Sequence, residues 1–114
     1  MKTTKIVLVS YPLEGNLQIC LAEILKICIN AQRARYIPVA PQIFAIVDQR
    51  NTDQQTHRVV SDCIEMYLSN MLVDELWLYG SELTKDMIAS VRLAHRHSIR
   101  IVPKSEILRR FFVS

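Results

Sequence analysis

The stretch DELWLYGSELTKDMIASVRLAHRHSIRIV, residues 74–102, decides the fold of this chain. It opens with the apolar run 76–79, which has the length and the aromatic content of a buried strand. Gly80 and Ser81 end that run. Residues 99–102 predict another strand, which Pro103 ends.

A helix is expected between these two strands. Thr84 can cap it, and its apolar stripe is formed by Met87, Ile88, Val91 and Ala94. A strand, a helix and a second strand form one right-handed crossover unit. In such units ligands bind where the strand ends and the helix begins, because unpaired helix amides point there. Residues 80–90 are therefore the first candidates for binding or catalysis.

The N-terminal half repeats the alternation of strand and helix. The continuous apolar run 6–9 predicts a strand that is buried on both faces of a parallel sheet. The helix that follows is apolar on more than one side, since Ile19, Ile27 and Ile29 fall outside its main stripe. We therefore expect it to contact both the sheet and a partner subunit. The main stripe consists of Leu17, Cys20, Leu21, Ile24, Leu25, Cys28 and Ala31.

The middle of the chain is less regular. Residues 36–40, with Pro38 and Pro41 nearby, predict a short strand at or near an edge, because proline cannot donate to a ladder. Residues 43–47 fit either a loop over the end of the sheet or a short helix. Residues 48–56 fit a surface loop or the start of the next helix, which the apolar spacing places over residues 59–72.

These elements predict an α/β protein. A short helix from Ser105 to about Phe112 completes one domain, residues 1–114. We expect a Rossmann- or flavodoxin-like three-layer sandwich with four or five mainly parallel strands and the first strand in the centre. The loops 10–16 and 79–86 should then face one crevice.

Composition excludes several classes of function. A net charge of +3 over 114 residues is too small for a dedicated nucleic-acid binder, and no apolar run is long enough to span a membrane. Cys20, Cys28 and Cys63 have no metal-type spacing, so we expect reduced cysteines in a cytoplasmic protein. No HxxxH, CxxC, GxSxG or P-loop motif is present, so neither a metal nor another cofactor is expected.

The first loop offers polar and small residues before a helix N-terminus. Ser10, Tyr11, Gly15 and Asn16 would let backbone amides approach a phosphate or a sugar hydroxyl. The alternative is that a tight turn between strand and helix needs its glycine without any ligand.

Three segments together carry a family resemblance: VSYPLEGN (9–16), IPVAPQIF (37–44) and the stretch from Val73 to residue 102. The chain resembles the nucleoside 2-deoxyribosyltransferase-like superfamily, and more closely its short bacterial and phage members without an established function. The resemblance implies a Rossmann-like domain that forms a homodimer or a larger oligomer. It also implies a nucleoside or nucleotide bound between the strand ends, and the active enzymes cleave an N-glycosidic bond with a carboxylate nucleophile.

The chain departs from this pattern at the position of the nucleophile. Related chains have a Ser/Thr, then a glycine, then a glutamate where this chain has Thr84, Asp86 and Ser90. Glycosyl transfer needs a carboxylate, which a serine without a base does not replace. Glu14 would also repel a phosphate. We therefore expect a binding or regulatory protein that has lost the reaction, with ligand contacts from Ser10, Tyr11, Gly15, Asn16, Gly80, Ser81, Thr84 and Ser90.

Two other functions stay open. Asp86 or Glu82 could act as the carboxylate of an active N-glycosidase or deoxyribosyltransferase, although Asp86 is more simply a first-turn acid that favours the helix dipole. The chain could also be a small phage-type inhibitor that acts on a protein partner through its apolar helix and a basic patch. That patch consists of Arg92, His95, Arg96, His97 and Arg100, which also fit a solvated helix C-terminus.

Overall fold

The computed structural model describes residues 4–47 and 53–112, with the backbone alone for residues 53–57. Within this part, four parallel strands form one sheet in the order β2-β1-β3-β4. The strands are β1 (Ile6–Ser10), β2 (Ile37–Val39), β3 (Glu75–Leu78) and β4 (Arg100–Pro103). The α/β prediction is confirmed, with β1 in the interior of the sheet and the proline-containing β2 at an edge.

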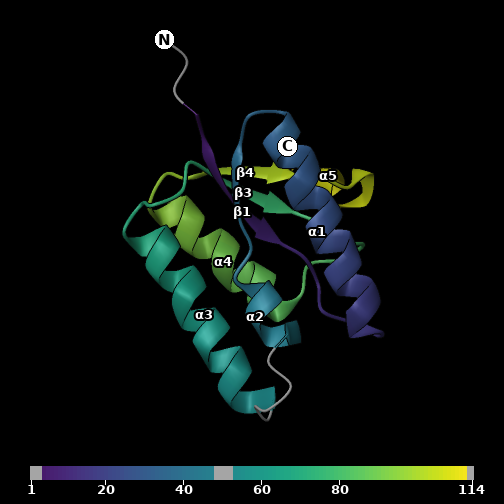
Figure 1. Cartoon of the computed structure of the whole chain (residues 1–114). Helices are drawn as coiled ribbons and strands as arrows, with labels where there is room; N and C mark the ends of the chain where they lie inside the picture. The colour runs from purple at the N-terminus through teal and green to yellow at the C-terminus, as the bar shows by residue number, and fades with distance from the viewer. Residues whose placement is uncertain (1–3, 48–52, 113–114) are drawn as a thin grey trace.

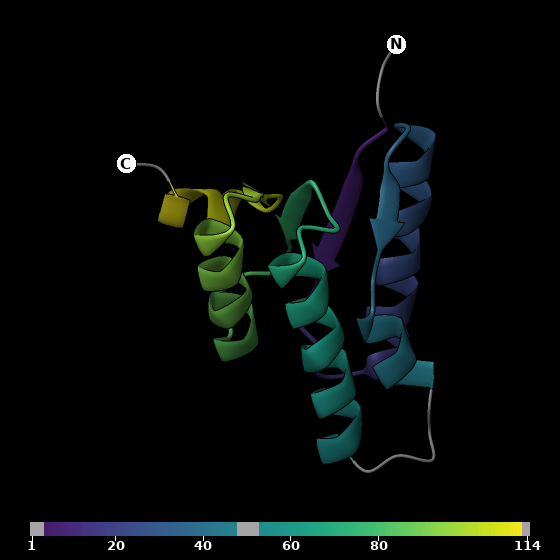
Figure 2. The same cartoon turned by 90° about the vertical axis from the view of Figure 1, so that its left-hand side faces the viewer.

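Helices cover both faces of the sheet, which gives the three layers of a Rossmann- or flavodoxin-like sandwich (Figures 1 and 2). One face is covered by α1 (Leu17–Arg33), and the other is covered by α3 (Asp53–Ser69) and α4 (Lys85–Arg96). The short helix α2 (Gln42–Val47) follows β2, and α5 (Glu106–Phe112) follows β4. Residues 43–47 are thus helical, whereas residues 48–52 lie outside the described part.

The core has a different character on the two faces because side chains alternate along each strand. Leu8, Leu76 and Leu78 belong to a large aliphatic cluster with residues of α3, α4 and α5. Val7 and Trp77 belong to a smaller cluster with Ala31 of α1. Since β1 and β3 carry buried side chains on both faces, the interpretation of their continuous apolar runs as buried strands is confirmed.

Both strands of the C-terminal half differ by one residue from the predicted bounds. β3 begins at Glu75, and β4 includes Pro103, which pairs with Leu78. Proline is tolerated there because β4 is an edge strand whose outer side has no partner in the described sheet. The ladder continues for one more residue, since the Lys104 amide donates to the Leu78 carbonyl (2.8 Å).

Candidate functional site

A cavity of about 380 Å³ lies at the C-terminal end of β1. Its walls come from four parts of the chain: the loop after β1, helix α2, helix α3 and the first turns of α4. The strand order reverses between β1 and β3, and α/β proteins bind ligands outside the carboxyl ends of the strands at such a point. The cavity therefore lies on the side of the sheet where the sequence places the candidate residues.

The structure brings together about half of the residues that the sequence singles out. Ser10, Tyr11, Thr84, Asp86 and Ser90 line the cavity. Gly15, Asn16, Gly80, Ser81 and Glu82 are not among its lining residues.

Two residues of the first loop serve the start of α1. The Asn16 side-chain oxygen accepts hydrogen bonds from the amides of Gln18 (2.9 Å) and Ile19 (3.3 Å), so this asparagine is the N-cap. Gly15 has a φ of +70°, and a Cβ added there would meet no atom within 4 Å. Its positive φ is sufficient to explain the glycine.

Gly80 fixes the distance between the two loops. It has a φ of +105°, and a Cβ at this position would lie 2.6 Å from Cγ of Pro12. Only glycine allows this approach. Because Pro12 lines the cavity, the contact holds one wall of the cavity against the end of β3.

Two serines carry hydroxyl groups in buried positions at the cavity. Ser10 is 5% exposed and Ser90 is 6% exposed. The Ser90 hydroxyl donates to the Asp86 carbonyl of the preceding turn (3.1 Å). No hydrogen bond of the Ser10 hydroxyl is found within the described residues. A buried hydroxyl that has no partner in the protein is a group that a ligand or a water molecule can satisfy.

The N-terminus of α4 adds backbone donors to the same wall. Thr84 caps the helix, because its side chain accepts from the Met87 amide (3.2 Å) and its carbonyl accepts from the Ile88 amide (2.9 Å). The amides of Lys85 and Asp86 lie in the first turn, where an α-helix supplies no acceptor. They are available to an acceptor atom of a ligand.

Helices α2 and α3 contribute residues that the sequence does not single out. The Gln42 side chain accepts from the Tyr11 amide (3.0 Å) and donates to the Tyr11 carbonyl (2.7 Å), which fixes the first loop against α2. Ser61 adds a hydroxyl from α3, and the apolar lining comes from residues such as Ala45, Val60 and Ile64. Helical periodicity could identify the buried side of α3 but not which of its residues reach a cavity.

Burial changes the acidity of two phenols near the strand ends. Desolvation raises the pKa of Tyr11, and the neighbouring Cys20 and Glu23 raise it further. Desolvation, with a smaller effect of Cys28, raises the pKa of Tyr79 to about 12. The two rings lie 6.5 Å apart between centroids. Both phenols are therefore protonated at neutral pH, so Tyr11 can donate a hydrogen bond but cannot act as a base there.

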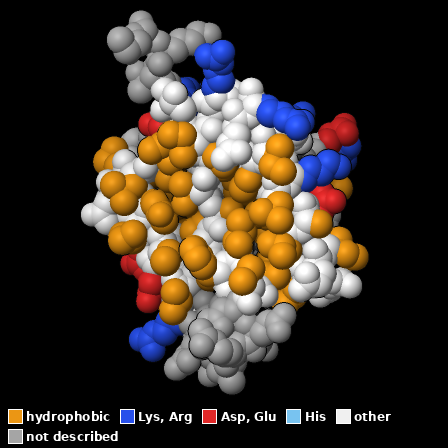
Figure 3. Space-filling model, viewed as in Figure 1, with side chains coloured by type: hydrophobic (Ala, Val, Ile, Leu, Met, Phe, Trp, Pro, Cys, Tyr) orange, Lys and Arg blue, Asp and Glu red, His pale blue; other side chains and the backbone are white. Residues whose placement is uncertain are grey.

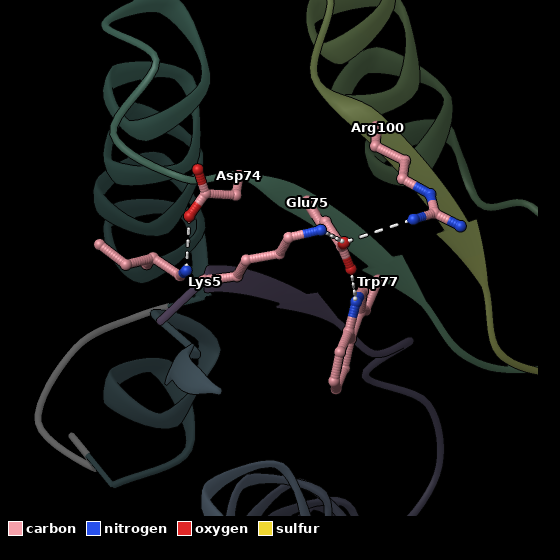
Figure 4. Close-up of polar contacts among 6 residues, drawn as sticks. Lys5, Asp74, Glu75, Trp77 and Arg100 are labelled. Atoms are coloured by element: carbon pink, nitrogen blue, oxygen red, sulfur yellow. Dashed lines mark hydrogen bonds and ion pairs between the residues drawn. The ribbon is translucent and has the colours of Figure 1, made fainter. Parts of the chain in front are cut away.

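At the opposite end of the sheet, polar groups are paired with one another (Figure 4). Glu75 is 4% exposed. Its carboxylate accepts from Nε1 of Trp77 (2.8 Å) and forms ion pairs with Lys5 (3.4 Å) and Arg100 (3.7 Å). Arg100 thus has a specific partner, in addition to its place in the basic patch. Of that patch, Arg92, His95 and Arg96 are exposed, whereas His97 is half-buried.

Two other kinds of site are absent from the described residues. No group of three or more His, Cys, Asp or Glu side chains there could hold a metal ion. No helix in the same part of the chain is both long and apolar enough to cross a membrane. The three cysteines are unpaired thiols, of which Cys20 is buried.

The chain is thus an α/β protein with a parallel sheet and a cavity at the carboxyl end of its first strand. The sequence from residue 5 to residue 104 matches the family defined as a domain of unknown function, DUF7768. The chain belongs to that family. No curated protein matches the sequence.

Proposed function

We propose that this chain binds a nucleoside-like small molecule in the cavity at the end of β1, and that it does so without cleaving it. The observation that carries the proposal is the cavity itself. Its volume of about 380 Å³ falls within the range of small-molecule sites, which combine apolar walls with a few convergent polar groups. The proposal keeps the likeness to the deoxyribosyltransferase-like superfamily as a guide to the ligand class only.

The lining suits the two halves of a nucleoside. Ala45, Val60 and Ile64 offer apolar surface on which a flat base can pack. The Ser10 hydroxyl and the Asp86 carboxylate can bond to sugar hydroxyls, which both donate and accept. The free amides at the start of α4 can donate to a carbonyl of the base or to a sugar oxygen.

The charges around the cavity favour a neutral nucleoside over its phosphate. Glu14 and Asp86 are both carboxylates that line it, and Lys85 is the cation among the described lining residues. All three are exposed, so each acts through solvent and weakly. Because two carboxylates repel a phosphate dianion and one lysine attracts it, the net effect of these charges still disfavours the phosphate.

The environment of Ser90 argues against catalysis by this residue. Its hydroxyl already donates to the Asp86 carbonyl, and no histidine is present among the described residues that line the cavity. A serine becomes a nucleophile only when a base accepts its proton. A second candidate function uses Asp86, which is among the residues that line the cavity, as the nucleophile of N-glycosidic cleavage.

Thermal unfolding with a panel of ribonucleosides, deoxynucleosides and their monophosphates tests the proposal. A ligand at about one hundred times its dissociation constant stabilises the folded state by about 2.7 kcal/mol, which raises the Tm of a domain of this size by roughly 11 °C. Ser61→Trp should remove the shift by filling the cavity. Ala89→Trp, at an exposed position of α4 that does not line the cavity, should leave it intact.

Two outcomes would count against this function. If no nucleoside or monophosphate changes the Tm at millimolar concentration, the ligand class is wrong. If the monophosphates bind more tightly than the nucleosides, the charge argument is wrong. The second candidate is tested by following free-base release from the same nucleosides: release that is lost in Asp86→Asn but kept in Ser90→Ala would establish Asp86 as a nucleophile.

A further inference from the structure

A broad apolar face surrounds the edge strand β2. Figure 3 shows hydrophobic side chains gathered over α1, β2, α2 and α3, while acidic and basic side chains lie towards the rim of the same view. We call this surface the β2 face. Seven large side chains of these elements are each between 44% and 69% exposed: Leu25, Ile29, Ile37, Phe44, Val47, Val59 and Met66.

The two long helices beside β2 each carry an outer stripe that is poor in charge. Helical spacing (i, i+3, i+4, i+7) places on one flank of α1 the residues Gln18, Leu21, Ala22, Leu25, Ile29 and Gln32. The same spacing places on one flank of α3 the residues Val59, Cys63, Met66, Tyr67 and Asn70, with the exposed Asp62 at the margin of this stripe. Solvent-facing helix flanks normally carry charged residues, so the α1 stripe has the composition of a buried contact, and the α3 stripe has it apart from Asp62 at its margin.

The strand between these helices is not suited to accept another strand. The Ile37 amide donates inward to the Lys5 carbonyl (2.9 Å), so the next residue, Pro38, turns its backbone outward. Proline has no N–H to offer at that edge. A partner must therefore bind the β2 face through side chains rather than by extending the sheet.

The exposed apolar area is large enough for a stable dimer. From their exposed fractions, the seven side chains present roughly 700 Å² of surface, whereas the largest apolar patch of a typical monomer is about 300–600 Å². A standard protein interface buries about 800 Å² on each partner. The partly exposed neighbours Leu21, Cys63 and Tyr67 extend the same surface.

We propose that the β2 face binds a second copy of this chain. Homodimer interfaces are more apolar than transient ones and are poor in charge at their centre, as both helix stripes are. In a two-fold dimer one patch of this composition contacts its own copy, so apolar surface meets apolar surface without a separate complementary partner. None of the seven side chains is among the residues that line the cavity.

Sedimentation velocity of the full chain tests this proposal. The wild type is expected to be a dimer at tens of micromolar concentration. Phe44→Glu should weaken the dimer by about a hundred-fold or more, because a carboxylate would be buried without a partner. Phe111→Glu on α5 is the matched control: Phe111 is 62% exposed and Phe44 is 69% exposed, so both variants should fold, but the control should remain dimeric.

A second variant tests the same interface from another element. Leu25→Glu on α1 should also give monomers, whereas Ile19→Glu, which lies on another side of the same helix and is 62% exposed, should not. Circular dichroism of each variant separates dissociation from unfolding. The proposal would be overturned if the wild type were monomeric. It would also be overturned if Phe111→Glu disrupted the dimer while Phe44→Glu and Leu25→Glu remained folded and dimeric.

Discussion

The two ends of the parallel sheet differ in whether a buried polar side chain is left without a hydrogen-bond partner. At the N-terminal end, the carboxylates of Asp74 and Glu75 are satisfied by groups of the protein: Asp74 accepts from the Ile6 amide (2.7 Å), and Glu75 has three partners. At the C-terminal end, the buried Ser10 hydroxyl has no partner among the described residues. This difference indicates that the N-terminal end is structural and that the C-terminal end can accept a ligand, because buried polar groups are otherwise paired.

The largest loss of stability is expected from a substitution at the contact between Gly80 and Pro12, which holds the two loops at the C-terminal end of the sheet together. Gly80→Ala should destabilise the fold by about 3 kcal/mol, because the new Cβ would meet Pro12 at 2.6 Å while the residue keeps a strained positive φ. Urea unfolding measures the loss. Gly15→Ala is the control, since Gly15 also has a positive φ but lies in open space, and it should cost about 1 kcal/mol. Equal losses for the two variants would show that the loops do not depend on this contact.

The next largest effect is expected at the paired, N-terminal end. Glu75→Ala should lower the free energy of unfolding by about 2–3 kcal/mol, because it leaves the buried Nε1 of Trp77 without an acceptor and opens a small cavity. The two cations contribute less, since the Lys5 and Arg100 side chains are 51% and 71% exposed and can return to water. Chemical denaturation gives the value.

Glu75→Gln separates the hydrogen bond from the ion pairs. The amide oxygen can still accept from Trp77, so this variant should lose only about 1 kcal/mol. If the unfolding free energy fell as much as in Glu75→Ala, the ion pairs rather than the hydrogen bond would account for the stability at this end of the sheet.

The architecture could be predicted because its signals are local. The apolar runs 6–9 and 76–79 are each readable as a doubly buried strand, and Pro38 excludes β2 from the centre of the sheet. The choice between loop and helix for residues 43–47 could not be made, since a six-residue helix is stabilised by packing against its neighbours more than by its own sequence.

Residues that line the cavity could be predicted only where they lie at the end of a strand or in the loop that follows it. Ser10 ends β1 and Thr84 lies in the loop after β3, so the rule for parallel sheets finds them. Gln42 and Ser61 reach the cavity from α2 and α3, whose positions depend on tertiary packing. Asn16 and Gly80 fit a binding loop by residue type but serve a helix cap and a loop contact, and sequence alone does not distinguish these uses.

The smallest change in stability is expected from a substitution of Ser10, and it tests the difference between the two ends of the sheet most directly. Ser10→Ala should leave the unfolding free energy within about 1 kcal/mol of the wild type, or raise it, because the substitution removes a buried hydroxyl that no described residue satisfies. The same variant should weaken binding of whichever nucleoside shifts the Tm, since a ligand loses a hydrogen-bonding group. Urea unfolding and calorimetric titration measure the two effects separately. A stability loss well above 1 kcal/mol would mean that Ser10 is as fully paired as Glu75, and the C-terminal end would then be structural as well.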